Sequence, residues 1–243
     1  KTVTTAALAA CALRTRRRVA VVKPVQTGVV PGEPGDLAEV GRLTGLTDLH
    51  EYLRYPEPLA PATAARRLGE RGPELAELAG RITGLADRDL VIVEGAGGAL
   101  VRFNDRDEGI CELAGAVRQL ASAGGRGALR IEVVLVSTAA LGCLHDAGAS
   151  AGALRERGWG PHHLVVGDWP AEAGLAERCN LVDLPCYAGA PLHGVIGHGA
   201  GALAPAAFAE AAVRSLAPAL GGRWDTADFV RRSAAPEPMR VSR

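Results

Sequence analysis

The chain has 243 residues, of which 48% are hydrophobic and 4% aromatic, which is enough for one globular domain with a sizeable core. Its 27 basic and 27 acidic residues cancel, so composition gives no electrostatic footprint for nucleic acid. The apolar runs are too interrupted to span a bilayer, the start lacks the form of a secretory signal, and the five scattered cysteines favour reduced, buried thiols, so we expect a cytoplasmic protein.

The chain opens with Lys1-Thr2 at the start of a predicted helix that runs through Ala6 to Leu13. A Lys-Thr pair that opens a helix is also how the phosphate loop Gly-x-x-x-x-Gly-Lys-[Ser/Thr] ends. In that loop, backbone amides and the lysine hold phosphates and the hydroxyl binds magnesium. Two residues are too few to define the motif, so on this stretch alone an ordinary helix start is the favoured interpretation.

A short buried strand from Val19 ends in Lys23, and Pro24 fixes the backbone directly after it. Because an isolated buried ammonium is costly, Lys23 must either reach solvent or face an anion, and the residues leave both open. Asp36 then stands where the N-cap of a helix over 37–43 belongs. It is either a plain cap, which is the commoner role, or a carboxylate of a metal site.

A proline-rich connection over 55–61 and two predicted helices, over 62–68 and about 74–85, lead to the stretch 90–98. Its continuous apolar run predicts a strand buried on both faces of a parallel sheet. Glu94 falls where this strand ends, and ligands of open α/β sheets collect at the carboxyl ends of strands. The glycines that follow would let a phosphate or a metal approach the backbone. A glycine loop in which Glu94 caps a neighbouring helix is supported equally well.

The second half of the chain alternates strands and helices. We expect strands over 131–136, 162–168 and 192–196, and helices over 111–121, 141–156, from 171 onward and over 205–216. This alternation predicts an α/β fold, with a mostly parallel sheet and helices on both faces. Residues 1–222 form the predicted domain, and residues 223–243 a charged C-terminal tail with room for one helix over 225–232.

Several of these sites fit one pattern. Lys-Thr opens a helix, Val-Lys-Pro-Val-x-Thr-Gly at 22–28 ends the next strand, an Asp follows in the loop, and Val-Glu-Gly-Ala-Gly-Gly at 93–98 follows a third strand. In order and spacing, over nearly the full chain, the sequence closely resembles the dethiobiotin synthetase family of the P-loop NTPase superfamily. Two later stretches, 191–196 and 216–222, support the resemblance. It implies a P-loop NTPase-like three-layer sandwich.

The resemblance implies an ATP-dependent ligase of biotin biosynthesis. Such an enzyme makes dethiobiotin from 7,8-diaminononanoate, CO2 and ATP through a carbamate and a carbamic-phosphoric anhydride. Carried over to this chain, Lys1 would hold the outer phosphates, Lys23 would neutralise the carbamate and the transferring phosphoryl group, and Thr27 would hydrogen-bond the carbamate. Thr2, Asp36 and Glu94 would surround Mg²⁺, a hard ion that prefers oxygen ligands. The implied nucleotide-binding residues are Lys1, Thr2, Asp36, Glu94, Gly95, Ala96, Gly97, Gly167, Asp168, Gly197, His198 and Gly199.

The family is a homodimer, and the resemblance implies that the partner subunit contributes to the substrate site. The turn at the start of the helix over 141–156 would contact the far carboxylate of the substrate. The implied residues of that turn are Leu141, Gly142, Cys143 and His145. No nucleic acid and no membrane is expected as a partner.

Three departures from the family pattern stand out. The chain lacks the first strand and the glycine half of the phosphate loop, so we expect roughly 15 to 20 further residues ahead of Lys1. Where many members carry an asparagine that reads adenine, this chain has Gly167-Asp168, which leaves the choice of nucleoside triphosphate open. His145 replaces another asparagine, and the turn 197–199 replaces one that contains proline.

Rival interpretations remain at this stage. A cobyrinate amidating synthase would share the sheet but needs a second, glutaminase-like domain for which the chain has no length. A partition or positioning ATPase of the same superfamily would need a DNA or membrane surface, against which the neutral charge argues. An inactive fragment of the synthetase is the third alternative.

Overall fold

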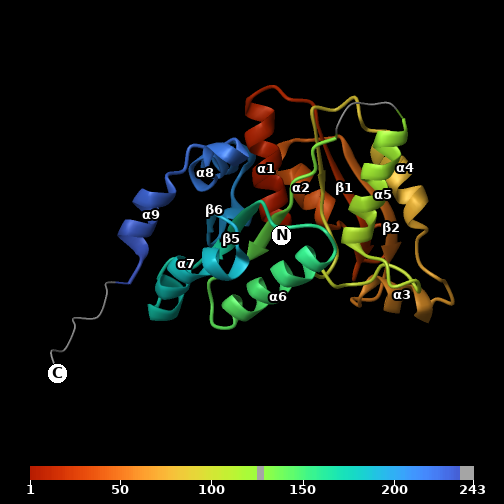
Figure 1. Cartoon of the computed structure of the whole chain (residues 1–243). Coiled ribbons are helices and arrows are strands. Elements are labelled where there is room, and N and C mark those ends of the chain that lie inside the picture. Colours follow the sequence, from red (N-terminus) through yellow and green to blue (C-terminus); the bar gives the residue numbers. More distant parts are fainter. Residues whose placement is uncertain (125–128, 236–243) are drawn as a thin grey trace.

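A computed structural model describes residues 1–124 and 129–235 of the chain. Helices and strands alternate along it (Figure 1), as the sequence predicts. The strands are β1 (Val19–Thr27), β2 (Leu49–Tyr55), β3 (Leu90–Val93), β4 (Val134–Ser137), β5 (His163–Trp169) and β6 (Leu192–Gly197). The α-helices are α1 (Thr2–Arg14), α2 (Asp36–Thr44), α3 (Pro61–Arg67), α4 (Leu75–Thr83), α5 (Ile110–Ala123), α6 (Cys143–Glu156), α7 (Leu175–Ala188), α8 (Pro205–Ser215) and α9 (Thr226–Ser233), with short 3₁₀ turns at Ala200–Ala202 and Pro218–Leu220.

The strands are all parallel and form two sheets, with the orders β2-β1-β3 and β4-β5-β6. The α/β class and the parallel pairing are therefore confirmed, but the strands divide into two three-stranded sheets. Helix α1 contacts β1 and β3 of the first sheet and β5 of the second. It joins the two sheets on one face.

Alternate residues of the central strands face opposite helical layers, as the pleat of a strand requires. Val21 of β1 and Val165 of β5 pack in one cluster with α1, α2 and α8. Val22 lies on the opposite face of the first sheet, among residues of α3, α4 and α5. Val166 lies on the opposite face of the second sheet, among residues of α6 and α7. The three layers of the predicted sandwich follow from this alternation.

Strand β3 is less buried than its apolar run predicts. Its four residues are half-buried, as are those of β4, whereas the first eight residues of β1 and the first four of β5 are buried. The expectation of a strand buried on both faces is thus wrong for β3. The reason is position, because β3 and β4 are edge strands of their sheets in the described part of the chain.

Strand β2 is absent from the sequence prediction. Its seven residues, Leu-His-Glu-Tyr-Leu-Arg-Tyr, are mostly half-buried and include two charged side chains. Glu51 and Arg54 neutralise one another on this edge strand, with Arg54 Nε 2.6 Å from Glu51 Oε1. Polar residues of this kind are common in edge strands, but they interrupt the hydrophobic pattern from which a strand is predicted.

Pro24 sits inside the central strand β1, where a missing N–H normally breaks a ladder. Odd-numbered residues of β1 bond to the β2 side, as Val21 N does with Asp48 O at 3.0 Å. Even-numbered residues bond to the β3 side: Val22 O accepts a hydrogen bond from Glu94 N at 2.9 Å. The nitrogen of Pro24 therefore points to the β3 side of β1, but beyond the last residue of β3. No backbone N–H is needed there to continue the hydrogen bonds of the sheet.

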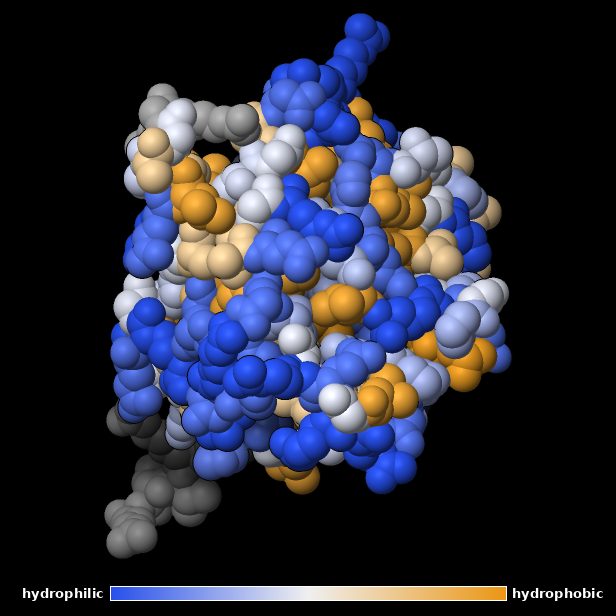
Figure 2. All heavy atoms as spheres, turned by 90° about the vertical axis from the view of Figure 1, so that its right-hand side faces the viewer, coloured by the Kyte–Doolittle hydropathy of each residue, from blue (hydrophilic) through white to orange (hydrophobic). Residues whose placement is uncertain are grey.

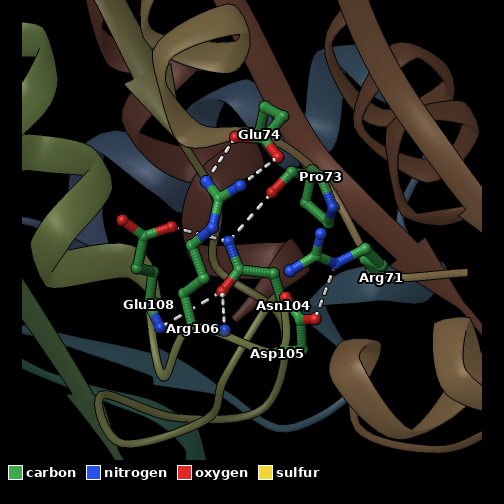
Figure 3. Close-up of polar contacts among 7 residues, drawn as sticks. All are labelled: Arg71, Pro73, Glu74, Asn104, Asp105, Arg106 and Glu108. Atoms are coloured by element: carbon green, nitrogen blue, oxygen red, sulfur yellow. Dashed lines mark hydrogen bonds and ion pairs between the residues drawn. The ribbon is translucent and has the colours of Figure 1, made fainter.

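Asn104 holds the loop that follows β3, in an arrangement that we call the Asn104 clasp (Figure 3). Its side chain is buried, and Nδ2 donates to Pro73 O at 2.9 Å and to Glu108 Oε2 at 2.7 Å. Its Oδ1 accepts from the backbone N–H of Arg106 at 3.0 Å and of Glu108 at 3.3 Å. The amide thus makes every hydrogen bond it can, two donated and two accepted.

The chain after residue 222 packs against the second sheet as far as it is described. Trp224 is buried, and Phe229 of α9 meets the Trp169 ring edge-on at 5.7 Å between centroids. The expected C-terminal helix is present as α9, and residues 236–243 of the predicted tail lie outside the described residues. Helix α9 is therefore fixed by aromatic packing.

The surface agrees with a balanced composition. Figure 2 shows the side that carries α3, α4 and α5, where polar side chains predominate and apolar ones are scattered between them.

Of the five cysteines, Cys11, Cys111 and Cys143 are buried as expected, whereas Cys179 and Cys186 are exposed on α7. Within the described ranges, the helices are all too short or too polar to span a membrane.

Three histidines meet at the amino ends of β5 and β6, the edge opposite to the carboxyl ends. His163 is buried and its Nδ1 lies 2.6 Å from Nδ1 of His193. Its Nε2 lies 3.6 Å from Glu132 Oε2, which is too long for a hydrogen bond. Burial lowers the pKa of His163 and outweighs the opposing effect of Glu132, while His193 and His162 lower it further.

Candidate active site

A buried ion cluster lies at the carboxyl end of the first sheet. Val22 of β1 pairs with Val93 of β3, so Lys23 and Glu94 are the next residues along two adjacent strands. Lys23 Nζ lies 2.9 Å from Glu94 Oε1 and 2.5 Å from Asp36 Oδ2. The side chains of Lys23 and Glu94 are only 4% and 3% exposed. The sequence left open whether Lys23 reaches solvent or faces an anion, and the structure places it against two carboxylates.

The first turn of α1 closes the cluster from the side. Thr2 Oγ1 donates to Glu94 Oε1 at 3.0 Å, so the residue after Lys1 touches the carboxylate at the end of β3. Lys1 itself precedes the helix and is exposed. Lys23 Nζ also donates to the Gly95 carbonyl at 3.4 Å. Lys23, Glu94 and Thr2 thus come together from three segments that the sequence predicts separately.

The cluster keeps Lys23 charged. Burial alone would lower the pKa of Lys23, but the charges and hydrogen bonds of Glu94 and Asp36 outweigh burial, so that its pKa is raised above the usual value. The group is therefore a permanent cation at neutral pH. A group of this kind stabilises negative charge and does not act as a base.

The cluster also fits a divalent metal ion by its donor set. Glu94 Oε2 is buried and has no hydrogen-bond partner among the described residues. Lys23, Asp36 and Glu94 together carry a net negative charge, and the Thr2 hydroxyl adds a third oxygen. Two carboxylates and a hydroxyl are ligands of the type that magnesium prefers. The described residues contain no group of three or more His, Cys, Asp or Glu side chains for a metal.

Asp36 is positioned by its neighbours on β1. It is the first residue of α2, whereas Gly35 is the N-cap, so the expectation of an Asp36 cap is wrong by one position. Its backbone N–H donates to Gln26 Oε1 at 3.0 Å. A Cβ at Gly35 would lie 2.9 Å from the same oxygen, which explains why glycine stands there. The side chain of Asp36 is then free to reach Lys23.

Gln26 is a site residue that the sequence reading missed. It is 4% exposed, and it links β1 to α2 through Asp36 while its Nε2 donates to Thr27 O at 3.0 Å. A glutamine in an otherwise apolar strand is the signal that would have indicated it. Thr27 is the last residue of β1 and is half-buried.

The glycine turn after Glu94 is tightly folded. Gly97 has φ +82°, and a Cβ there would lie 2.5 Å from Val101 Cγ2, so the turn requires glycine at this place. Ala96 is 7% exposed and packs in the core with Val22 and Phe103. The side chain of Ala96 faces the interior, so only backbone atoms of this turn face the ion cluster.

The expected base-contacting residues lie at the tips of β5 and β6. Asp168 and His198 are exposed, and His198 Nδ1 lies within hydrogen-bond distance of Asp168 Oδ1, at 3.1 Å. Gly167 is half-buried, and a Cβ there would lie 2.7 Å from Val136 Cγ1. An asparagine at 167 would therefore clash with β4. Gly197, the last residue of β6, and Gly199 flank His198, and all three residues are exposed.

The residues of the turn before α6 differ in their exposure to solvent. Leu141 is 85% exposed, His145 is exposed and Gly142 has φ +94°. Cys143 is 2% exposed, so its side chain cannot contact a substrate. Asn180 of α7 donates to Ala139 O at 2.8 Å and fixes the base of the turn. The turn therefore projects a large apolar side chain into solvent from a rigid base.

Comparisons with known proteins agree with this site. A family profile described as an AAA domain matches residues 1–199. The chain is 52% identical over 233 residues to the ATP-dependent dethiobiotin synthetase BioD of Frankia casuarinae, covering 96% of this chain and 93% of that protein. It is 50% identical over 232 residues to the protein of the same name from Streptomyces avermitilis, covering 94% and 92%. At this identity over nearly the whole of both chains, the chain belongs to the ATP-dependent dethiobiotin synthetase family.

Proposed function

We propose that this protein is a dethiobiotin synthase, an ATP-hydrolysing ligase that closes the ureido ring of dethiobiotin from 7,8-diaminononanoate and CO2. One observation carries the proposal: the buried Lys23 ammonium contacts Asp36 and Glu94 beside the first turn of α1. The close relatives are named ATP-dependent dethiobiotin synthetases, which points to the same reaction.

The proposed reaction has three steps. One amine of the diamine adds to CO2 and loses a proton, which gives a carbamate. A carbamate oxygen takes the terminal phosphoryl group of ATP, so that ADP leaves and a carbamic-phosphoric anhydride forms. The second amine attacks the carbonyl carbon, phosphate leaves with the C–O bond electrons, and the attacking nitrogen loses a proton.

Lys23 acts on the charges of the first two steps. Its raised pKa keeps the ammonium protonated while negative charge builds up on the carbamate and on the transferring phosphoryl group. Thr27 ends the same strand and is the hydrogen-bond donor for the carbamate. Lys1 and the first turn of α1 hold the outer phosphates, with the backbone amides of residues 95–97 and the tips of β5 and β6 along the rest of the nucleotide.

Thr2, Asp36 and Glu94 are the proposed ligands of Mg²⁺, which would neutralise phosphate charge when bound. The unpartnered Glu94 Oε2 supports this assignment. Asp36, 35% exposed, faces the cluster from the start of α2 and has room to serve a second ligand besides Lys23.

A homodimer in the cytoplasm completes the proposal. In it the turn at Leu141, Gly142, Cys143 and His145 of one subunit meets the far carboxylate of the substrate bound in the other. Cys143 offers only its backbone, because its side chain is buried. The turn is exposed at Leu141 and His145 and is held at its base by Asn180, so a second chain can reach it.

The diamine dependence of nucleotide hydrolysis tests the proposal. Purified protein is assayed for phosphate release and, by mass spectrometry, for dethiobiotin, with Mg²⁺ and bicarbonate and with or without 7,8-diaminononanoate. We expect phosphate release only with the diamine, and one dethiobiotin per phosphate. Hydrolysis that ignores the diamine would favour a partition or positioning ATPase, and no hydrolysis would favour an inactive fragment.

A further inference from the structure

Asp36 is attached to β1 at two points. Its carboxylate Oδ2 lies 2.5 Å from Lys23 Nζ, and its backbone N–H donates to Gln26 Oε1 at 3.0 Å. Lys23 and Gln26 both belong to β1, so one strand holds the side chain and the backbone of Asp36. The direction in which this carboxylate points is therefore set by β1.

Gln26 supplies a cap that the residues next to α2 do not provide. The first N–H groups of a helix have no acceptor within the helix, and the side chain of the N-cap residue commonly accepts from one of them. The N-cap residue here is Gly35, which has no side chain for that purpose. Its carbonyl accepts from Ala38 N at 3.0 Å and from Glu39 N at 3.4 Å. The N–H of Asp36 donates instead to Gln26, ten residues earlier, so β1 fixes the place where α2 begins.

Both ends of the Gln26 amide are used. A backbone N–H can only donate, so the atom that faces Asp36 N is the amide oxygen, and Nε2 is left to donate to Thr27 O at 3.0 Å. Gln26 is 4% exposed, so its amide is shielded from water. A glutamate would lack the donor, and a methionine would lack both groups. Glutamine is therefore the side chain of this length that serves both partners.

Arg54 of β2 holds the loop ahead of α2 independently of Gln26. Its Nη1 donates to Glu33 O at 2.7 Å and to Val30 O at 3.1 Å. Glu51 binds the guanidinium through Nε at 2.6 Å and Nη2 at 2.9 Å. Loss of the Gln26 amide should therefore leave this loop in place and release only the start of α2.

We propose that Gln26 is a positioning residue, which orients the Asp36 carboxylate within the proposed Mg²⁺ site that it shares with Glu94. This inference rests on the proposed function. Mg²⁺ demands nearly ideal octahedral geometry, so a carboxylate that moves with a loosened helix start binds it less well. Removal of a group that hydrogen-bonds and orients a metal ligand typically costs about tenfold to 100-fold in metal affinity.

The Mg²⁺ dependence of ADP binding tests the inference without turnover. Calorimetry gives the affinity for ADP in Mg²⁺ and in EDTA, and the ratio of the two affinities measures how well the protein holds the metal. In Gln26→Met, which keeps the length of the side chain, we expect this ratio to fall about tenfold, with the affinity in EDTA changed less than about twofold. In diamine-dependent turnover, the Mg²⁺ concentration for half-maximal rate should rise by a similar factor, with the KM for the diamine unchanged.

Gln26→Asn is the companion variant, because its amide is one methylene too short to reach Asp36, and it should show the same fall in the ratio. Gln119→Met is the matched control, since Gln119 is an exposed glutamine on α5, and it should leave the ratio unchanged.

An unchanged ratio in Gln26→Met would overturn the inference, and so would an unmodified protein whose affinity for ADP is the same in Mg²⁺ and in EDTA. If neither Gln26 variant folds, Gln26 serves the fold and the inference is wrong. Absence of diamine-dependent turnover in the unmodified protein would overturn the proposed function, whereas the ADP measurements decide the inference.

Discussion

Glu94 and Asn104 are two buried polar residues on the same stretch of chain, 4% and 3% exposed as whole residues, and they differ in how completely their side chains are hydrogen-bonded. Every donor and acceptor of the Asn104 amide is used, by the backbone of residues 73, 106 and 108 and by the Glu108 carboxylate. Glu94 instead shares Oε1 between Lys23 and Thr2 and leaves Oε2 without a partner among the described residues.

The difference distinguishes a structural site from the candidate functional one. A buried polar group that completes its hydrogen bonds stabilises one conformation and has nothing left for a ligand. A buried carboxylate with a vacant oxygen carries a desolvation cost that a bound cation or substrate would offset. On this reasoning, disturbing the Glu94 cluster should reduce activity most, and disturbing the Asn104 clasp should reduce stability most.

The largest expected effect is that of Lys23→Met. The substitution removes the fixed cation from the reacting groups, so we expect kcat to fall about 100-fold to 1000-fold. It also leaves the Glu94 and Asp36 carboxylates without their counter-ion, which should lower the free energy of unfolding by about 3 kcal/mol. Steady-state kinetics and urea denaturation measure the two effects.

A double variant, Lys23→Met with Glu94→Gln, separates the two causes. It removes the uncompensated buried charge, so the free energy of unfolding should return most of the way to that of the unmodified protein. The activity should stay low, because the cation is still missing. Recovery of activity along with stability would mean that Lys23 acts only on the fold.

Asn104→Ala should have the second largest effect, and on stability. It leaves buried backbone groups and the Glu108 carboxylate without partners, so we expect a loss of about 2 to 3 kcal/mol in the free energy of unfolding. At a temperature where the variant is folded, kcat should change by less than about twofold. Urea denaturation and the synthase assay measure the two quantities.

Asn104→Asp serves as the companion variant. It keeps the shape of the side chain but replaces two N–H donors with a carboxylate that faces Glu108, so its loss of stability should equal or exceed that of Asn104→Ala. If both variants lose activity and keep their stability, the contrast between the clasp and the ion cluster is wrong.

The His163 site should show an intermediate, pH-dependent effect. Its pKa is lowered by burial from an ordinary value of 6.5, so below pH 6.5 the unfolded chain binds a proton that the folded chain does not. The free energy of unfolding should therefore fall as the pH drops below 6.5, by at most about 1.4 kcal/mol per pH unit for one group. Denaturation curves between about pH 7.5 and about pH 5.5, one unit on either side of the ordinary histidine pKa, should show a shallower fall in His163→Leu.

The smallest effect should come from Glu74→Gln. Glu74 pairs with Arg106 beside the clasp (Figure 3), but the two side chains are 56% and 48% exposed and solvent screens their attraction. The free energy of unfolding and kcat should both stay within measurement error. A loss comparable to that of Asn104→Ala would show that exposed charges, and not the buried amide, hold the loop.

Much of the fold could be predicted because it depends on local pattern. The apolar run 90–93, the Lys-Pro step at 23–24 and the helices after them follow from residue type and period. Strand β2 escaped prediction because its polar residues suit a sheet edge, which is a property of its neighbours. The half-burial of β3 and the position of Asp36 one residue past the cap also depend on what lies beside them.

The sequence by itself determined the parts of the candidate site: a lysine and a glutamate at strand ends, a hydroxyl at a helix start and an aspartate before another helix. Only the tertiary structure decided that they meet, because the register of β1 against β3 makes Lys23 and Glu94 neighbours and the packing of α1 brings Thr2 to the same carboxylate. It also decided which buried polar groups are satisfied, since hydrogen bonds between distant segments depend on distances that no residue pattern contains.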